Sequence, residues 1–175
     1  MTIGVVVEKR SALSRWTGET WRTIAVIPGS GSAEPGCILE TGSGWTRYYA
    51  GHLELTLHRS GTAGYRQNLS APEPLLYVVL RPRNDDRNDA MQIEHGRDEP
   101  GEGRGVEPFL VTACPFEAQD YLDSGEETVD AVRMPPPVAA WVQAFLDRHH
   151  VDEPFVKRKQ KPKSGSFLGG GRHAR

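Results

Sequence analysis

Leu75-Leu76-Tyr77-Val78-Val79-Leu80 is the longest apolar stretch of this chain. Six apolar residues in succession, three of them β-branched or aromatic, favour a β-strand. Because no polar residue alternates with them, we expect this strand to be buried on both faces. The stretch is much shorter than the about 18 residues of a membrane-spanning helix. We therefore place it inside a folded core.

Shorter segments before this stretch predict further strands. Leu53, Leu55 and Leu57 alternate with polar residues, and this period of two is typical of a half-buried strand. For residues 65–69 a further strand and a single helical turn both remain open. The other strands expected in this half of the chain are residues 3–7, 21–27, 37–39 and 45–49.

The second half of the chain predicts two helices. Pro115 suits the first turn of a helix that runs to about residue 123, with Gly125 beyond its end. A second helix is expected from Val138 to about His150, after three prolines, and its apolar residues recur at the spacing of one helical face. These apolar residues, which we expect to pack on the sheet, are Val138, Trp141, Val142, Phe145 and Leu146.

The order of the elements indicates the fold class. Two further strands are expected at residues 109–113 and 128–134. A run of strands followed by helices is typical of the α+β class. We therefore expect an antiparallel, strongly twisted sheet or a partly closed barrel of six to eight short strands, with two late helices.

Charge is divided unevenly along the chain. Residues 156–175 contain seven Lys or Arg and no Asp or Glu, whereas the whole chain contains 21 basic and 23 acidic residues. Residues 1–155 therefore carry 14 basic and 23 acidic residues, a formal charge of −9. We expect a single globular domain over 1–155 and a basic disordered tail over 156–175, called the basic arm below. Residues 83–107 contain eight carboxylates and are expected to form a long mobile surface loop.

Few residues are candidates for chemistry, and each has an ordinary structural explanation. Cys114 precedes a predicted helix N-terminus, which would stabilise a thiolate, but cysteine is also among the most buried residue types. His149 and His150 suggest a metal site, with Asp152 or Glu153 as further ligands. Adjacent residues on a helix point about 100° apart, so capping or packing at the helix end is the simpler explanation. We expect no catalytic, cofactor-binding or metal-binding residue.

The compartment is inferred from the cysteines and the N-terminus. Cys37 and Cys114 do not form a disulfide framework, and in a reducing compartment both would be free thiols. The N-terminus is apolar first and charged afterwards, the reverse of a signal peptide. We expect a cytoplasmic protein.

Trp16 and the basic arm are the candidate partner-binding groups. Exposed aromatic side chains are enriched at interfaces, and clustered Lys and Arg bind acidic protein surfaces or nucleic-acid phosphates. The alternatives for the arm are that it is solvated or that it contacts the acidic residues 83–107. The candidate partner-binding residues are Trp16, Phe155, Lys157, Arg158, Lys159, Lys161 and Lys163.

Three blocks of sequence resemble one protein family. The first block is Trp16-x4-Trp21-Arg22 with Ala25-Val26-Ile27-Pro28. The second runs from Leu53-x-Leu55-x-Leu57-His58 through Tyr65-Arg66-x-Asn68-Leu69 to Pro74-x2-Tyr77-Val78-Val79-Leu80-Arg81. The third, which is the most specific, runs from Val111-Thr112-x2-Pro115-Phe116-Glu117 to His149-His150-Val151-x2-Pro154-Phe155-x-Lys157-Arg158-Lys159. Together they resemble an uncharacterised proteobacterial family, a domain of unknown function, over about residues 1–160.

The resemblance implies association with a molybdoenzyme, because genes of this family often lie beside those of a molybdenum-dependent formate dehydrogenase. It implies no catalytic residue, since the family has none agreed. We therefore expect a non-catalytic accessory or maturation protein that binds a redox enzyme subunit or its maturation factor, without a cofactor and away from membranes. The alternatives are a small nucleic-acid-binding module that uses the basic arm, and an enzyme with a thiol or metal centre at Cys114 or at His149 and His150.

Overall fold

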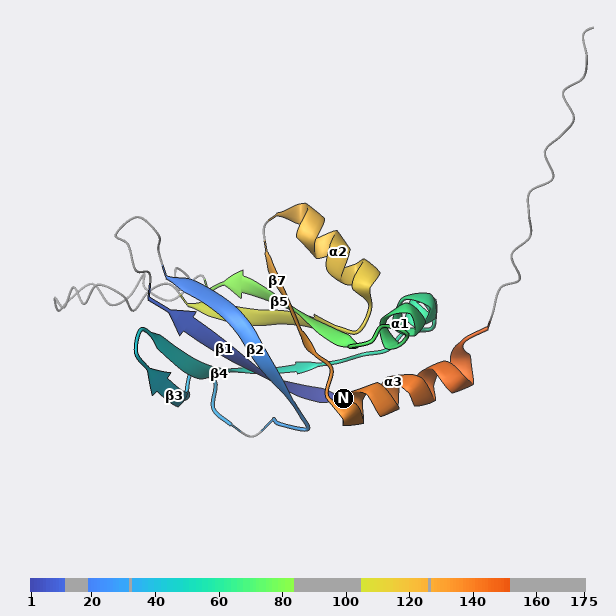
Figure 1. Ribbon diagram of the computed structural model, residues 1–175, viewed down its shortest axis with the longest axis horizontal. Coiled ribbons are helices and arrows are strands. Elements are labelled where there is room, and N and C mark those ends of the chain that lie inside the picture. The colour runs from blue at the N-terminus through green and yellow to red at the C-terminus, as the bar shows by residue number, and fades with distance from the viewer. Residues whose placement is uncertain (12–18, 32, 84–104, 126, 152–175) are drawn as a thin grey trace, which may run out of the picture.

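The computed structural model describes residues 1–11, 19–31, 33–83, 105–125 and 127–151. These residues form seven antiparallel strands in two sheets, together with three α-helices (Figure 1). The α+β class and the antiparallel strands are therefore confirmed. Three features predicted from the sequence lie outside the described part of the chain. They are Trp16, most of the acidic loop (residues 84–104) and the basic arm.

The first sheet contains the first four strands in the order β2-β1-β4-β3. Two register shifts, between Val5 and Val6 and between Val6 and Val7, interrupt the pairing of β1 with its neighbours. Such bulges increase the local twist of a sheet, as expected for a strongly twisted sheet. The four strands are β1 (Thr2–Arg10), β2 (Thr20–Pro28), β3 (Ile38–Gly42) and β4 (Trp45–Glu54).

The second sheet has the order β6-β5-β7, formed by β5 (Leu75–Pro82), β6 (Val106–Thr112) and β7 (Thr128–Arg133). The apolar stretch at 75–80 is thus the central strand of its sheet. Val78, Val79 and Leu80 are consecutive and all buried, which confirms burial on both faces of this strand.

The two sheets pack against each other instead of closing into a barrel. β4 contacts β6, and β2 contacts β7, but the described strands form two separate hydrogen-bonded sheets. One core runs between the sheets and includes Ile3 and Val5 of β1 together with Leu76 and Val78 of β5. The described strands thus fit the expected strongly twisted antiparallel arrangement, divided into two sheets and without a closed barrel.

Three helices flank the sheets, one more than expected. α2 (Pro115–Ser124) and α3 (Pro136–His149) are the two late helices, and Gly125 ends α2 with a φ of 69°, the left-handed conformation that glycine adopts readily. α1 (Thr62–Leu69) follows a short 3-10 turn at Arg59–Gly61. Residues 65–69 are therefore helical, which settles the alternative left open by the sequence.

α3 buries the apolar face that its sequence predicts. Val138, Val142 and Leu146 are buried in the core between the sheets, and Trp141 and Phe145 pack against it. α3 also contacts α1, so these two helices lie together at one end of the molecule (Figure 1). In the described residues, no helix has both the length and the apolar character that a membrane crossing requires.

Two strand predictions were wrong in detail. The alternation of Leu53, Leu55 and Leu57 does not mark a separate strand, because β4 continues through Leu53 and ends at Glu54. Leu55 is buried and its backbone N–H donates to the carbonyl of Met1, so the alternation reflects core packing of an extended segment. The strand expected at 109–113 begins earlier, at Val106, because it pairs with β5 up to Pro82.

Candidate functional site

The predicted partner-binding residues fall outside the described chain, but their neighbours show where they begin. Arg10 and Thr20, which flank the segment containing Trp16, lie at one end of the first sheet. Val151, the last described residue before the basic arm, lies at the other end of the molecule beside α1 and α3 (Figure 1). Val151 is 78% exposed. The two predicted partner-binding elements therefore start from opposite ends of the fold.

His149 and His150 both make contacts at the end of α3. The ring of His149 lies 4.6 Å from the ring of Phe145, one helical turn earlier. The backbone N–H of His150 donates to the carbonyl of Leu146, and its Nε2 lies 3.0 Å from Nη1 of Arg66 in α1. A guanidinium has only donors, so Nε2 of His150 is the acceptor. Among the described residues, no cluster of three or more His, Cys, Asp or Glu is close enough to hold a metal ion.

Cys114 is a buried thiol at the N-terminus of α2, and Cys37 is an exposed one; neither is in a disulfide. The backbone N–H of Cys114 donates to Oγ1 of Thr112, which in turn donates to Oε2 of Glu117 at 2.6 Å. These bonds order the first turn of α2. Cys114 is buried in the hydrophobic core, as expected from the usual burial of cysteine.

The thiol of Cys114 lies against Gly64 of α1. A Cβ on residue 64 would lie 2.5 Å from Sγ of Cys114 and 3.2 Å from the ring of Phe116. The two helices therefore approach each other closely at a position that only glycine fits.

We predict that Gly64→Ala lowers the free energy of unfolding by about 1–2 kcal/mol, because overpacking exceeds the helix propensity that alanine gains. In a Cys114→Ala background the same change should become neutral or stabilising, since the sulfur is gone. Urea unfolding of the four variants measures this coupling. An equal loss in both backgrounds would show that the close approach of Gly64 and Cys114 is not the cause.

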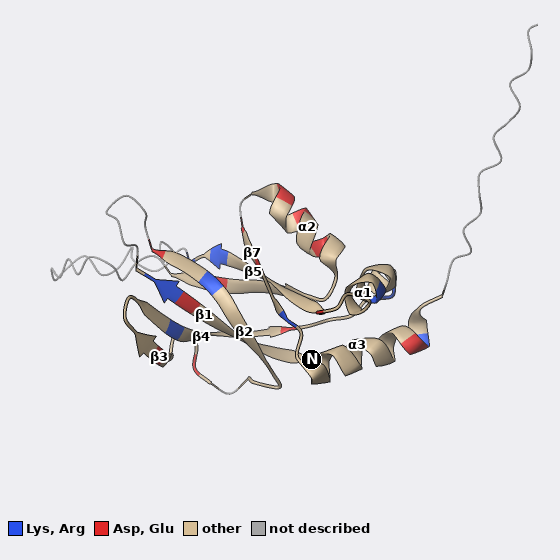
Figure 2. Ribbon diagram, in the orientation of Figure 1, with Lys and Arg blue, Asp and Glu red and all other residues tan. Residues whose placement is uncertain are grey.

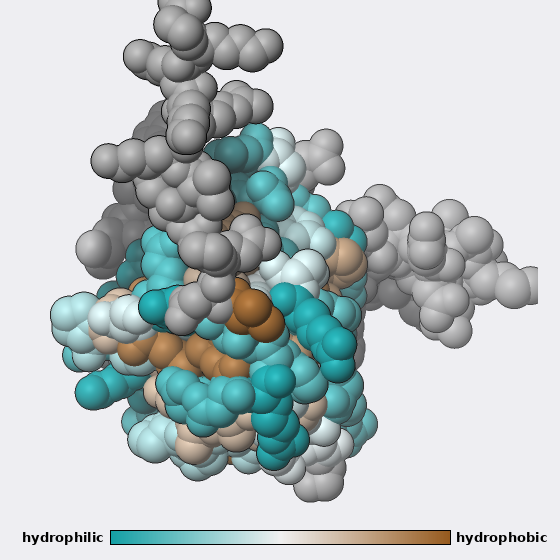
Figure 3. Space-filling model, turned by 90° about the vertical axis from the view of Figure 1, so that its right-hand side faces the viewer, coloured by the Kyte–Doolittle hydropathy of each residue, from teal (hydrophilic) through white to brown (hydrophobic). Residues whose placement is uncertain are grey.

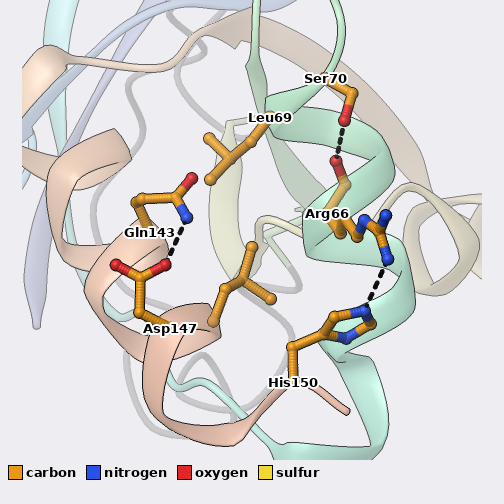
Figure 4. A pocket seen from close by; sticks show the side chains of 7 residues that line it. Arg66, Leu69, Ser70, Gln143, Asp147 and His150 are labelled. Carbon is orange, nitrogen blue, oxygen red and sulfur yellow. Dashed lines mark hydrogen bonds between the residues drawn. The ribbon is translucent and has the colours of Figure 1, made fainter. Parts of the chain in front are cut away.

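A groove lies between α1 and α3, at the end of the fold that contains Val151. It has a volume of about 380 Å³. In a view of this end, hydrophobic residues form a band across the middle of the face, with hydrophilic residues around it (Figure 3). The lining residues are Arg66, Leu69, Ser70, Gln143, Leu146, Asp147 and His150 (Figure 4).

Ser70, His150 and Asp147 are the residue types of a hydrolase triad, but their hydrogen bonds do not connect them as one. Oγ of Ser70 donates to the carbonyl of Arg66 at 2.7 Å, and Nε2 of His150 faces Arg66 (Figure 4). Oδ1 of Asp147 accepts from Nε2 of Gln143. A nucleophile needs a base within hydrogen-bond reach and a third group that orients the base. Ser70, His150 and Asp147 therefore do not form the nucleophile–base–orienting group chain of a triad in this structure.

Charge lines the opposite rims of the groove. The guanidinium of Arg66 stands on the α1 side and the carboxylate of Asp147 on the α3 side (Figure 4), and Leu69 and Leu146 also line the groove. Two of the seven lining residues are apolar, and the other five are polar or charged. The groove can therefore offer hydrogen bonds and opposite charges to the polar groups of a ligand, together with a small apolar contact at Leu69 and Leu146.

A second polar site lies on the first sheet, around the buried carboxylate of Glu8. Glu8 is only 5% exposed, and its two oxygens accept from Nε of Arg10 at 2.6 Å and Nε of Arg47 at 3.0 Å. The hydrogen bond from Arg10 is the largest influence on this carboxyl and, with that from Arg47, outweighs burial and lowers the pKa of Glu8. Glu8 is therefore ionised at neutral pH and holds both arginines in place.

Sequence reasoning missed the residues that organise both sites. Glu8 and Arg47 are 39 residues apart, and Arg66 and His150 are 84 apart, so local patterns carry no sign of either pair. In the sequence, Asn68 stands out only as part of the second block of the family resemblance. Its buried side chain hydrogen-bonds the carbonyls of Leu75 and Ala113, and so joins α1 to the start of β5 and to the residue before the N-cap of α2. The sequence feature that could have pointed to Asn68 is its place between a possible helical turn and a proline-rich turn.

With two facing sheets and a helix-bounded groove, the molecule is a small α+β protein whose hollows suit binding. The sequence also matches a family described as "Protein of unknown function (DUF3305)" over residues 2–159. Because the match spans most of the chain, this protein belongs to the DUF3305 family. No curated protein and no solved structure matches the chain.

Proposed function

We propose that this protein is a non-catalytic accessory protein that binds a segment of a partner protein in the groove between α1 and α3. The observation that carries the proposal is the groove itself, with oppositely charged rims and two leucines in its lining. Its Ser, His and Asp side chains are engaged by Arg66 and Gln143 rather than by one another.

The basic arm strengthens this assignment. His150 lines the groove and Val151 is the last described residue before the arm, so the described chain ends beside the groove. The arm carries seven positive charges and no negative one. A partner with an acidic surface beside its groove-binding segment would gain attraction from the arm and specificity from the groove.

The partner that we propose is a subunit or maturation factor of a cytoplasmic molybdenum-dependent formate dehydrogenase. This part of the proposal rests on the family resemblance and not on the geometry. An accessory protein of this kind needs a docking surface on a rigid scaffold, and packed helices such as α1 and α3 supply one.

A nuclease-treated pull-down from the native host tests this function, with the full chain compared with a 1–155 truncation and proteins identified by mass spectrometry. We expect a subunit or maturation factor of the dehydrogenase to be recovered, and its yield to fall severalfold on truncation because the arm is lost. If the full chain, the truncation and a mock bait all recovered the same set of proteins, the result would contradict the proposal. Nucleic acid that co-purifies without nuclease, and a binding constant that falls steeply with salt, would instead favour a nucleic-acid-binding module.

A further inference from the structure

A cavity of about 650 Å³ opens at the other end of the fold from the groove, over β1, β2 and β4. Three arginines line it, together with the carboxylates of Glu8 and Asp130, so the charged lining has a net charge of +1. Figure 2 shows basic and acidic positions on β1, and basic positions on its neighbours β2 and β4. The cavity is within the usual size range of small-molecule sites. Its lining residues are Glu8, Arg10, Thr20, Trp21, Arg22, Ile24, Arg47, Thr128 and Asp130.

The sheet register places the charges in one row. Glu8 of β1 pairs with Arg22 of β2 on one side and with Arg47 of β4 on the other. Arg47 pairs in turn with Glu40 of β3. Arg10 lies two residues after Glu8, so its side chain leaves the same face of β1. The arginines thus stand on three adjacent strands, on a rigid part of the fold.

Glu8 orients two of these arginines without using up their hydrogen-bonding capacity. It accepts from Nε of both Arg10 and Arg47, which leaves the terminal nitrogens of Arg10 for a ligand. Arg47 is further fixed by Glu40 at Nη1 and by the ring of Trp45, 4.4 Å from its guanidinium carbon. A guanidinium held in this way loses little conformational entropy when it binds an anion.

Arg22 is the third arginine that lines the cavity. It forms no ion pair with any of the residues that the structure describes. The other carboxylate of the lining, Asp130, already accepts the backbone N–H of Thr23 through Oδ2 at 2.6 Å. The hydroxyl-bearing side chains of Thr20 in β2 and Thr128 in β7 also line the cavity. The cavity therefore offers guanidinium donors from β1, β2 and β4, a hydroxyl from β2, and a carboxylate and a second hydroxyl from β7.

We infer that this cavity binds a small organic oxyanion, a phosphate or carboxylate group, between Arg10, Arg22 and Arg47. The planar donors of arginine match the paired oxygens of either group. Asp130 and the two threonines then accept or donate hydrogen bonds to the remainder of the ligand. This site is separate from the groove, and it stands whether or not the groove binds a partner.

Titration of the full chain with inorganic phosphate and, separately, with succinate tests this inference by NMR. We expect saturable shifts at the amides of Glu8, Arg22 and Arg47, with a Kd of about 1 mM or tighter for at least one probe. The probe that saturates identifies the phosphate or carboxylate class. Arg22→Gln should weaken binding at least about tenfold, since one charge-assisted contact is lost.

The matched control is Arg133→Gln, which removes an arginine whose side chain is 80% exposed and which does not line the cavity. It should leave the Kd unchanged. Shifts that stay linear up to about 20 mM of both probes, or that map only to the basic arm, would overturn the inference. Equal weakening by Arg22→Gln and Arg133→Gln would also overturn it, because it would show non-specific attraction of anions.

Discussion

Replacing Asn68 with alanine should lower the free energy of unfolding by about 2–4 kcal/mol, because three backbone groups lose their partners. Nδ2 of Asn68 donates to the carbonyls of Leu75 and Ala113, each at 2.7 Å. Oδ1 of Asn68 accepts from the backbone N–H of Leu75 at 2.9 Å. Asn68 is 6% exposed, so water replaces these bonds poorly.

Asn68 joins three elements that are distant in sequence. Asn68 lies in the last turn of α1, Leu75 begins β5, and Ala113 precedes α2. Urea unfolding followed by circular dichroism measures the loss, and Gln67→Ala on the exposed side of the same helix is the control, with an expected change within about 0.5 kcal/mol. Similar losses for Asn68→Ala and Gln67→Ala would contradict this role for Asn68.

Glu8→Gln should lower the free energy of unfolding at pH 7 by about 1–3 kcal/mol, because the amide removes the charge that holds two arginines. The hydrogen bonds from Arg10 and Arg47 lower the pKa of Glu8 in the folded protein. The pKa of a glutamate in the unfolded chain is about 4.3. A carboxyl whose pKa is lower in the folded protein stabilises the fold at pH values above the unfolded pKa. This stabilisation is lost as the pH falls through the folded pKa. The difference between wild type and Glu8→Gln should therefore be largest at neutral pH and shrink in acid.

Glu40→Gln is the matched control for this prediction. Glu40 also pairs with Arg47, but its side chain is 57% exposed, so its removal should change stability by less than about 1 kcal/mol. Unfolding curves at several pH values, from neutral to below pH 4, separate the two variants. A stability difference that is independent of pH, or equal for both variants, would show that the charge of Glu8 is not responsible.

The elements that follow from local chemistry could be predicted from the sequence. The apolar run at 75–80, the apolar face of α3, and Pro115 and Gly125 at the ends of α2 each depend on neighbouring residues alone. The failures arose where tertiary contacts override such patterns. Leu55 alternates like a strand residue, yet it lies beyond the end of β4 because Met1 supplies its hydrogen-bond partner.

The sites were harder to predict than the elements, because each depends on register or on helix pairing. The row of charges around Glu8 requires the order β2-β1-β4-β3, which no local pattern encodes. The groove requires α1 and α3, whose contact residues Arg66 and His150 are 84 positions apart. His150 was considered as a metal ligand or a helix cap, and its partner in the structure is an arginine from another helix.

The most direct test of the proposed function is a pull-down with the charges of the groove rims reversed, Arg66→Glu with Asp147→Lys. The control is Arg133→Glu with Glu73→Lys, which reverses an exposed pair elsewhere and also leaves the net charge unchanged. If the groove holds the partner, the first variant loses the partner recovered by wild type, while the control and the circular dichroism spectra of both stay unchanged. Equal recovery of the partner by the two folded variants would contradict the claim that the groove between α1 and α3 is its docking site.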